Sequence, residues 1–297
     1  MKLKHYTTLL GPACLFLFVL RAIELIITID PVSKQFSTHS IFPTVFNVVL
    51  LLLALFFATV LFTKTEPKPA TVRLARPSLF DVIIGVVSSM AMISSALFSL
   101  IFTVAEGSVP FNKIYTSGDF WQSVLAIGAA IFIIFYVTYP KRSVKKNLWR
   151  VLSLFLSGYT LCLLIRNFTD MDVVFSRSFG IYLIIFYGMA AAASISLSKI
   201  MARLIGRKTF TLFTCLMALF MALRMADTVL YLIPGNPYDI PCDLFTTVTD
   251  LLLTLLYLSQ MKKLLKGKKR RRPAATEEDP AGENSQQTDT AAQPNLE

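Results

Sequence analysis

Two pairs of oppositely charged residues stand inside long apolar stretches of the sequence. Arg21 is followed three residues later by Glu24, and Arg224 is followed three residues later by Asp227. Residues three apart lie on one face of a helix, so each pair can neutralise itself. Ionisable side chains in a membrane helix cost about 2.5–3.5 kcal/mol each and usually face other helices or a water-filled cavity. These residues could therefore bind an anionic group, and a cation or proton, inside a membrane.

The two charged pairs belong to an internal repeat. A shift of 203 positions superposes three embedded polar positions: Arg21 on Arg224, Glu24 on Asp227, and Asn47 on Asp250. Chance alignment of leucine-rich helices would rarely match three polar positions, and such self-similarity constrains the fold strongly. A weaker match, at a shift of 75 positions, aligns Asn47 with Gln122. An inverted repeat needs an odd number of helices in each unit, so the sequence predicts parallel repeats.

From the repeat we expect two equivalent groups of buried polar residues. Neighbouring antiparallel helices would form one group from Arg224, Asp227 and Asp250, and its counterpart from Arg21, Glu24 and Asn47. The first group has one negative charge in excess when all its members are ionised. Asp250 is therefore predicted to be the least compensated carboxylate and the candidate to hold a proton.

The candidate ligand-binding residues follow from these two groups. Asp243 joins them because it lies seven residues before Asp250, on the same face of a helix. The primary candidates are Arg21, Glu24, Asn47, Arg224, Asp227, Asp243 and Asp250, and the secondary candidates are Arg166 and Arg177.

The elements that must hold these residues are membrane-spanning helices. The 297 residues are 55% hydrophobic and only 16% charged, and their mean hydropathy is +0.62. A soluble domain would carry about 25% charged residues, so that class is excluded. Apolar runs of about 20 residues, long enough to cross a bilayer, recur along the chain. Eight spans are expected, near residues 7–29, 41–63, 80–104, 120–139, 150–168, 173–198, 209–233 and 243–261, of which the fifth is the shortest.

We expect the eight spans to form four helical hairpins in an all-α integral membrane fold. The hairpins cover approximately residues 1–69, 70–147, 148–206 and 207–266, and together they form one polytopic membrane domain, 1–266. Residues 267–297 are basic at first and then rich in acidic residues, Ser, Thr, Gln and Pro. This composition is typical of a disordered tail.

The basic residues lie mostly on one side of the predicted spans. That side holds 23 of the 29 Lys and Arg residues, whereas the opposite loops hold only Lys34 and Lys113. Cytoplasmic loops carry such an excess, so both termini are predicted to be cytoplasmic. The net charge of +11 is explained by these border positions, which meet anionic lipid headgroups, and nucleic acid is not expected as a partner. With no glycosylation inferred and no paired outer cysteines, the simplest assignment is the cytoplasmic (plasma) membrane of a bacterium.

The sequence predicts neither a metal site nor a cofactor. The four cysteines stand singly, and the two histidines, His5 and His39, lie in separate flanks. No CxxC, HExxH or glycine-rich phosphate loop occurs, so the sequence contains no ligand set for zinc or for a nucleotide.

Three classes of function are left open. The leading hypothesis is a small secondary transporter or substrate-capture membrane component, with an outward-facing charged pocket between hairpins 1 and 4 for a small anionic or zwitterionic ligand. The alternative is a non-catalytic membrane subunit or sensor that assembles with a membrane protein partner, in which the buried charges hold the helices in register. An intramembrane enzyme acting on a lipid-linked phosphate is less favoured because the sequence shows no nucleophile–base pair, and Tyr182 and Tyr187 are interpreted as packing or interfacial residues.

Overall fold

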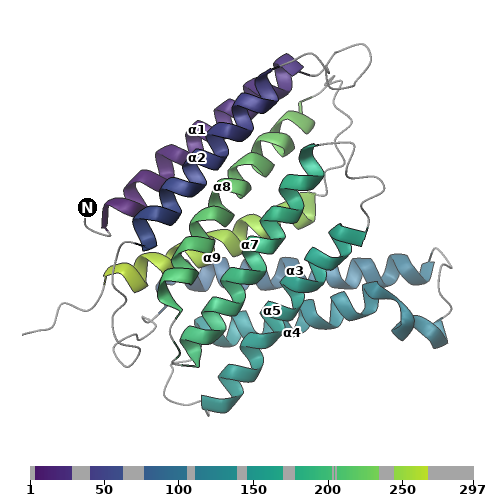
Figure 1. Ribbon diagram of the computed structural model, residues 1–297. Coiled ribbons are helices and arrows are strands. Elements are labelled where there is room, and N and C mark those ends of the chain that lie inside the picture. Colours follow the sequence, from purple (N-terminus) through teal and green to yellow (C-terminus); the bar gives the residue numbers. More distant parts are fainter. Residues whose placement is uncertain are drawn as a thin grey trace, which may run out of the picture. The chain divides into compact units, whose positions relative to one another are not determined.

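The computed structural model describes residues 4–28, 41–62, 77–105, 111–138, 146–169, 178–202, 204, 206–233 and 244–266. In that part of the chain eight helices are long and apolar enough to cross a membrane, and there is no strand. They are α1 (Lys4–Thr28), α2 (Phe42–Phe62), α3 (Leu79–Ala105), α4 (Gly118–Thr138), α5 (Lys146–Thr169), α7 (Ser178–Met201), α8 (Arg207–Tyr231) and α9 (Leu244–Lys266), with a short 3₁₀ helix η2 (Phe111–Thr116) before α4 (Figure 1). The expectation of an all-helical chain with eight membrane-length helices is confirmed.

A helix in lipid pairs the backbone groups of its interior with one another, whereas the groups at its ends need other partners. The start of α3 shows how local sequence sets a helix end. The backbone N–H of Ser78 donates to the Asp81 carboxylate at 2.7 Å, and the backbone N–H of Asp81 approaches the Ser78 hydroxyl at 3.4 Å. This reciprocal arrangement is a capping box, which satisfies two backbone donors at the N-terminus of the helix.

The helix α8 lies at the centre of the packing. It contacts α1, α2, α7 and α9, and most of its residues are buried. Helices α1 and α2 lie side by side along it (Figure 1). Further contacts join α3 with α4, α4 with α5 and with η2, α5 with α7, and α9 with α3 and α1.

Contacts between named residues give the relative directions of two neighbouring pairs. Between α1 and α8, Cys14 approaches the carbonyl of Ala218 and Arg21 bonds to Asp227, so sequence numbers rise together along both helices. These helices are therefore parallel. The same holds for α7 and α9, whose two hydrogen-bonded side-chain pairs are both separated by 63 positions in the sequence.

Other neighbours are antiparallel. Residues 89, 96 and 103 of α3 meet residues 130, 123 and 119 of α4 in that order. Along α8 and α9, Arg224 meets Asp250 and Cys215 meets Met261, so one number rises as the other falls. Both patterns result if successive helices along the chain run in alternating directions. The parallel contact of α1 with α8 is compatible with their equivalence in the repeat, although the repeat itself and the side on which the termini lie stay predictions.

Small residues allow some helices to approach closely. Gly128 of α4 faces the ring of Phe155 on α5, and a Cβ at that glycine would lie only 2.3 Å from a ring carbon. Between α3 and α4, the hydroxyls of Ser89 and Ser123 each donate to a backbone carbonyl of the other helix at 3.1 Å. Close approach and interhelical hydrogen bonds of this kind drive helix association in lipid, where apolar burial adds little.

Candidate functional site

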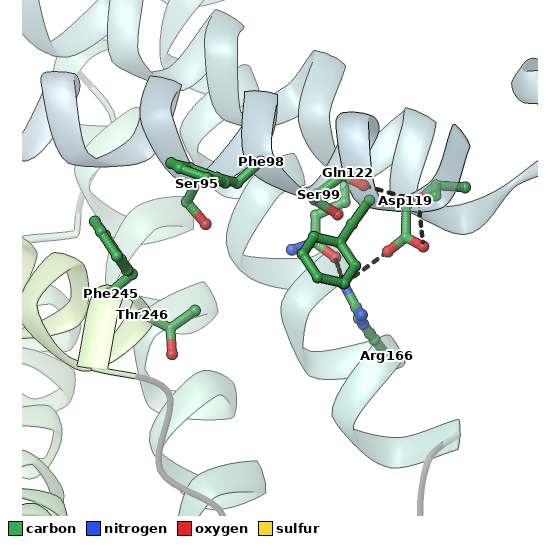
Figure 2. Close-up of a pocket in the computed structure, with 10 residues that line it drawn as sticks. Ser95, Phe98, Ser99, Asp119, Gln122, Arg166, Phe245 and Thr246 are labelled. Carbon is green, nitrogen blue, oxygen red and sulfur yellow. Dashed lines mark hydrogen bonds and ion pairs between the residues drawn. The ribbon is translucent and has the colours of Figure 1, made fainter. Parts of the chain in front are cut away.

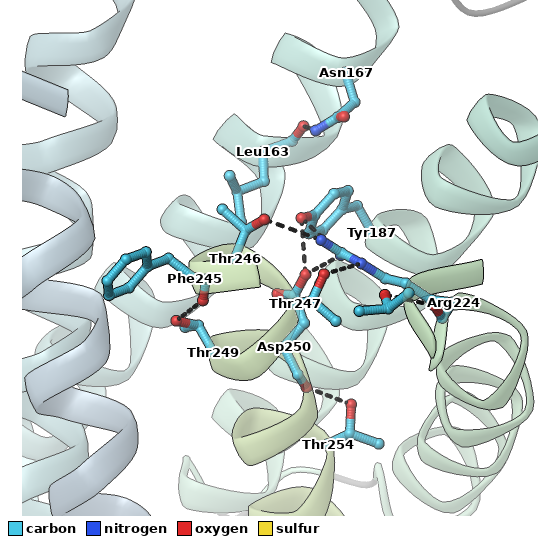
Figure 3. Close-up of polar contacts among 11 residues, drawn as sticks. Leu163, Asn167, Tyr187, Arg224, Phe245, Thr246, Thr247, Thr249, Asp250 and Thr254 are labelled. Atoms are coloured by element: carbon cyan, nitrogen blue, oxygen red, sulfur yellow. Dashed lines mark hydrogen bonds and ion pairs between the residues drawn. The ribbon is translucent and has the colours of Figure 1, made fainter. Parts of the chain in front are cut away.

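The guanidinium of Arg224 is the centre of a buried polar group that joins α7, α8 and α9 (Figure 3). It forms an ion pair with the carboxylate of Asp250. It also donates to the hydroxyls of Tyr187 at 3.2 Å, Thr247 at 3.2 Å and Thr246 at 3.0 Å. The Tyr187 hydroxyl in turn donates to Asp250 at 2.8 Å. One positive and one negative charge therefore balance each other inside a shell of hydroxyl groups.

The positions of these residues along their helices explain why they meet. Arg224 lies seven residues before the end of α8 at Tyr231, and Asp250 lies six residues after the start of α9 at Leu244. At a rise of about 1.5 Å per residue, both residues lie about 10 Å from these helix ends. Because the two helices are antiparallel neighbours, the residues meet at the same level. The prediction that Asp250 is the least compensated carboxylate is wrong, because the Arg224 guanidinium binds it directly.

A second buried group joins α1 to α8. The guanidinium of Arg21 donates from Nη1 to Glu24 at 2.8 Å and from Nε to Asp227 at 2.9 Å. The three residues are between 0% and 1% exposed, so no bulk water solvates them. The predicted grouping of Asp227 with Arg224 and Asp250 is therefore corrected: the parallel packing of α1 on α8 brings Asp227 to Arg21. The excess negative charge lies in this group.

Asn47 of α2 reaches the Arg21 group through a tyrosine of α7. Its side-chain oxygen accepts a hydrogen bond from the Tyr182 hydroxyl at 2.7 Å. The ring of Tyr182 lies 5.0 Å from the guanidinium carbon of Arg21, within cation–π distance. Asn47 is thus connected to Arg21 through Tyr182, whose hydroxyl bonds to Asn47 and whose ring lies near the guanidinium.

The two α7 tyrosines are the residues that sequence reasoning missed. Tyr187 donates to Asp250 as Tyr182 donates to Asn47, and Asp250 and Asn47 are the equivalent positions of the repeat. Each tyrosine ring also lies near an arginine, since Tyr187 is 5.8 Å from the guanidinium carbon of Arg224. One signal could have found them: a buried tyrosine hydroxyl normally needs a hydrogen-bond partner, and both tyrosines fall in an apolar span.

A pocket of about 460 Å³ lies next to the Arg224 group, among α3, α4, α5 and α9 (Figure 2). Its lining residues are Ser95, Phe98, Ser99, Phe102 and Thr103 of α3, Asp119 and Gln122 of α4, Arg166 of α5, and Phe245 and Thr246 of α9. Arg166 forms an ion pair with Asp119 at 2.8 Å and donates to the side-chain oxygen of Gln122 at 2.8 Å. The pocket therefore has a polar wall that carries both signs of charge.

Thr246 connects the pocket with the buried ion pair. Its side chain lines the pocket, and its hydroxyl accepts the hydrogen bond from Nη2 of Arg224. Figure 2 shows Phe245 and Thr246 at the opposite end of the pocket from Arg166. A molecule in the pocket could thus contact an α9 residue that also binds Arg224.

The location of this pocket differs from the predicted one between hairpins 1 and 4. Near the predicted location, a void lined by residues that include Arg224 and Asp227 measures about 10 Å³, less than a ligand needs. In this region the charged side chains of α1, α8 and α9 bind one another. The pocket of about 460 Å³ among the described residues is lined by α3, α4, α5 and α9.

The secondary candidates have separate outcomes. Arg166 lines the pocket, with 48% of its side chain exposed. Arg177 lies outside the described residues, as does the primary candidate Asp243. Within the described part of the chain, no group of three or more His, Cys, Asp or Glu residues could hold a metal ion.

Comparisons of the chain with protein-family models, with curated proteins and with solved structures find no match. The eight apolar helices are compatible with a multi-pass membrane protein. Chemically, the arrangement offers hydrogen-bond donors and acceptors and one ion pair around a pocket, beside a second, buried ion pair.

Proposed function

We propose that this protein is a multi-pass membrane component that captures a small polar ligand in the pocket among α3, α4, α5 and α9, as a small secondary transporter does in its binding step. The observation that carries the proposal is the pocket itself. Its volume of about 460 Å³ falls within the range of about 300–1,000 Å³ that is usual for ligand sites. Its polar groups converge on one space, which is the second usual property of such sites.

The proposed orientation follows the distribution of Lys and Arg along the sequence. Both termini lie in the cytoplasm of a bacterium, and the pocket opens toward the outer side. This agrees with the position of the pocket residues, because Asp119 lies at the start of α4 and Arg166 near the end of α5, at the ends that the charge distribution assigns to the outside.

A captured ligand would act on the contact between α8 and α9 through Thr246. A ligand that donates a hydrogen bond to the Thr246 hydroxyl oxygen competes there with Arg224, which donates to the same oxygen. Ligand binding is then coupled to the buried ion pair of Arg224 and Asp250, because both involve the first turns of α9. Differential contacts of this kind are what a ligand needs in order to shift a protein between two states.

Native mass spectrometry of the full chain in lipid nanodiscs tests the proposal. Arg166→Gln removes the cation of the pocket, and because the Arg166 side chain is about half exposed we expect the variant to fold. Arg150→Gln is the matched control, because it makes the same substitution at the other end of α5, away from the pocket. We expect a small bound species on the wild type and on Arg150→Gln that is lost from Arg166→Gln. If all three proteins carry the same bound species, or none of them carries one, the capture function is refuted.

The alternative is a non-catalytic subunit or sensor in a membrane assembly. One observation favours it: the buried charges of Arg21, Arg224 and their carboxylate partners bind one another, as residues with a structural role would. In that case the same experiment shows a stoichiometric protein partner on the wild type and on Arg166→Gln alike.

A further inference from the structure

We propose that the small polar group captured in the pocket is the headgroup of a zwitterionic membrane lipid, with its phosphate at Arg166 and its ammonium group at Asp119, while the acyl chains of the lipid lie along the exposed phenylalanines of α3 and α9. This inference rests on the proposed function, because it names the ligand class of the same pocket. Three independent features of the described residues carry it: the depth of the pocket, its apolar rim and its balanced charge.

The depth of the pocket matches that of lipid headgroups. Asp119 is the second residue of α4, and Arg166 lies three residues before the end of α5. Exposed aromatic residues mark the same level: Trp121 is 55% exposed and donates through its indole N–H to the backbone carbonyl of Tyr115 at 3.0 Å. Exposed Trp and Tyr side chains concentrate where a membrane meets water. The polar wall formed by Asp119 and Arg166 therefore lies at the height of the headgroups, and the pocket extends from there toward Ser95, deeper along α3.

The rim of the pocket is apolar and exposed. Phe98 and Phe102 of α3 and Phe245 of α9 line the pocket and are 59–61% exposed. The rings of Phe98 and Phe245 approach each other across the α3–α9 contact, with centroids 6.0 Å apart. On a helix that crosses a membrane, side chains exposed in this way contact acyl chains. An amphipathic ligand matches both the polar wall and this rim, whereas a free amino acid would leave the rim unused.

The charges of the wall select the headgroup. The charged side chains that line the pocket are Arg166 and Asp119, which are 48% and 30% exposed and therefore accessible to a ligand. A headgroup with a phosphate and an ammonium group can replace their single ion pair with two charge-assisted contacts. An anionic headgroup without an ammonium group would place its negative charge beside Asp119 uncompensated. The geometry thus favours a zwitterionic lipid over an anionic one.

Lipid competition in nanodiscs tests this inference directly. The full chain is reconstituted in equal amounts of phosphatidylethanolamine and phosphatidylglycerol, released from the nanodisc, and weighed with the lipids it retains. We expect the wild type and Arg150→Gln to retain phosphatidylethanolamine. Arg166→Gln should retain about tenfold less, which is the contribution of roughly one charge-assisted hydrogen bond. Asp119→Asn should retain phosphatidylglycerol instead, because the carboxylate that repels it is gone.

A second variant guards against a folding defect. Ser99→Leu places a larger side chain in the pocket, which Ser99 lines, and leaves Arg166 and Asp119 in place. The Ser99 backbone carbonyl accepts the hydrogen bond from Thr103, and a change of side chain does not remove it. We expect it to lower lipid retention as Arg166→Gln does, with an unchanged circular dichroism spectrum.

The outcomes separate this inference from the proposed function. If the wild type retains phosphatidylglycerol, the lipid inference is overturned and the capture function stands. The same holds if lipid-free protein in detergent binds free phosphoethanolamine or an amino acid and Arg166→Gln does not. Identical lipid retention by the wild type, Arg166→Gln and Ser99→Leu overturns the lipid inference. The capture function is overturned as well only when Arg166→Gln also leaves the binding of every small species unchanged.

Discussion

Arg21 and Arg224 occupy equivalent positions in the sequence repeat but have different electrostatic environments. Arg224 binds one carboxylate, that of Asp250, and several hydroxyls. Arg21 binds the two carboxylates of Glu24 and Asp227. Removing one member of a buried ion pair is costly because it leaves the other charge uncompensated, so the two environments should respond differently to the same change.

The first prediction compares Asp250→Asn with Asp227→Asn. Asp250→Asn removes the charge that balances Arg224 and should lower the free energy of unfolding by about 3 kcal/mol. Asp227→Asn leaves Glu24 to balance Arg21, and its amide oxygen can still accept from Nε, so it should cost about 1 kcal/mol or less. Thermal unfolding in detergent, followed by circular dichroism, measures both. Equal losses would contradict the assignment of Asp227 to Arg21.

The second prediction concerns the Tyr187 hydroxyl, which bonds to both Arg224 and Asp250. Tyr187→Phe keeps the ring and removes these two hydrogen bonds, so we expect a loss of about 1–3 kcal/mol in unfolding free energy. Tyr115→Phe is the matched control, because that side chain is 57% exposed and should tolerate the change. If Tyr187→Phe unfolds at the same temperature as the control, the hydroxyl contributes nothing to the group.

At the scale of elements, close helix contact depends on a few small residues. The α4–α5 contact brings Phe155 against Gly128, where a Cβ would overlap the ring. At Gly188 of α7, no atom of the described residues outside the adjoining helix backbone lies within 4 Å of the position that a Cβ would take. The same substitution at these two helical glycines should therefore have opposite effects.

The third prediction is that Gly128→Ala destabilises the protein and Gly188→Ala does not. Gly128→Ala forces α4 and α5 apart or distorts Phe155, which costs about 1–3 kcal/mol for an overpacked site. Gly188→Ala should be neutral or stabilising by up to about 1 kcal/mol, because alanine is the better helix former. Thermal unfolding of both variants in one detergent measures the difference. Destabilisation by both to the same degree would contradict the close α4–α5 contact.

At the scale of the whole molecule, the direction of each helix decides which residues share a side of the membrane. The parallel contacts of α1 with α8 and of α7 with α9, and the antiparallel contacts between α3 and α4 and between α8 and α9, fit an even number of crossings. The even number of crossings and the excess of Lys and Arg in the loops on one side of the predicted spans support two proposals: both termini are cytoplasmic, and the pocket is on the outer side.

The fourth prediction tests that topology. Fusions of a fluorescent protein that matures only in the cytoplasm should fluoresce at both the N-terminus and the C-terminus. In a cysteine-free variant, Lys113→Cys on the exposed surface of η2 should react with a membrane-impermeant thiol reagent added to intact cells. A cysteine that reacts only after the membrane is opened would place the pocket on the cytoplasmic side.

The sequence by itself predicted eight helices of membrane-spanning length and their approximate positions, and the structure confirms them in the described part of the chain. Length and hydropathy are local properties, so runs such as the one that holds Arg21 and Glu24 predict a helix wherever they are placed in the fold. The alignment of Asn47 with Asp250 in a repeat stays a prediction from the sequence, and each of these two residues accepts a hydrogen bond from a tyrosine of α7.

Only the tertiary structure decided which charges meet and where the pocket lies. The partner of Asp227 depends on the parallel neighbour of α8, and the contribution of Tyr182 and Tyr187 depends on α7 lying against α2, α8 and α9 at those residues. In lipid the apolar face of a helix fits many neighbours about equally well, so hydropathy does not specify which helices pack together. The pocket arises where α3, α4, α5 and α9 meet, and its residues come from segments whose association no local pattern encodes.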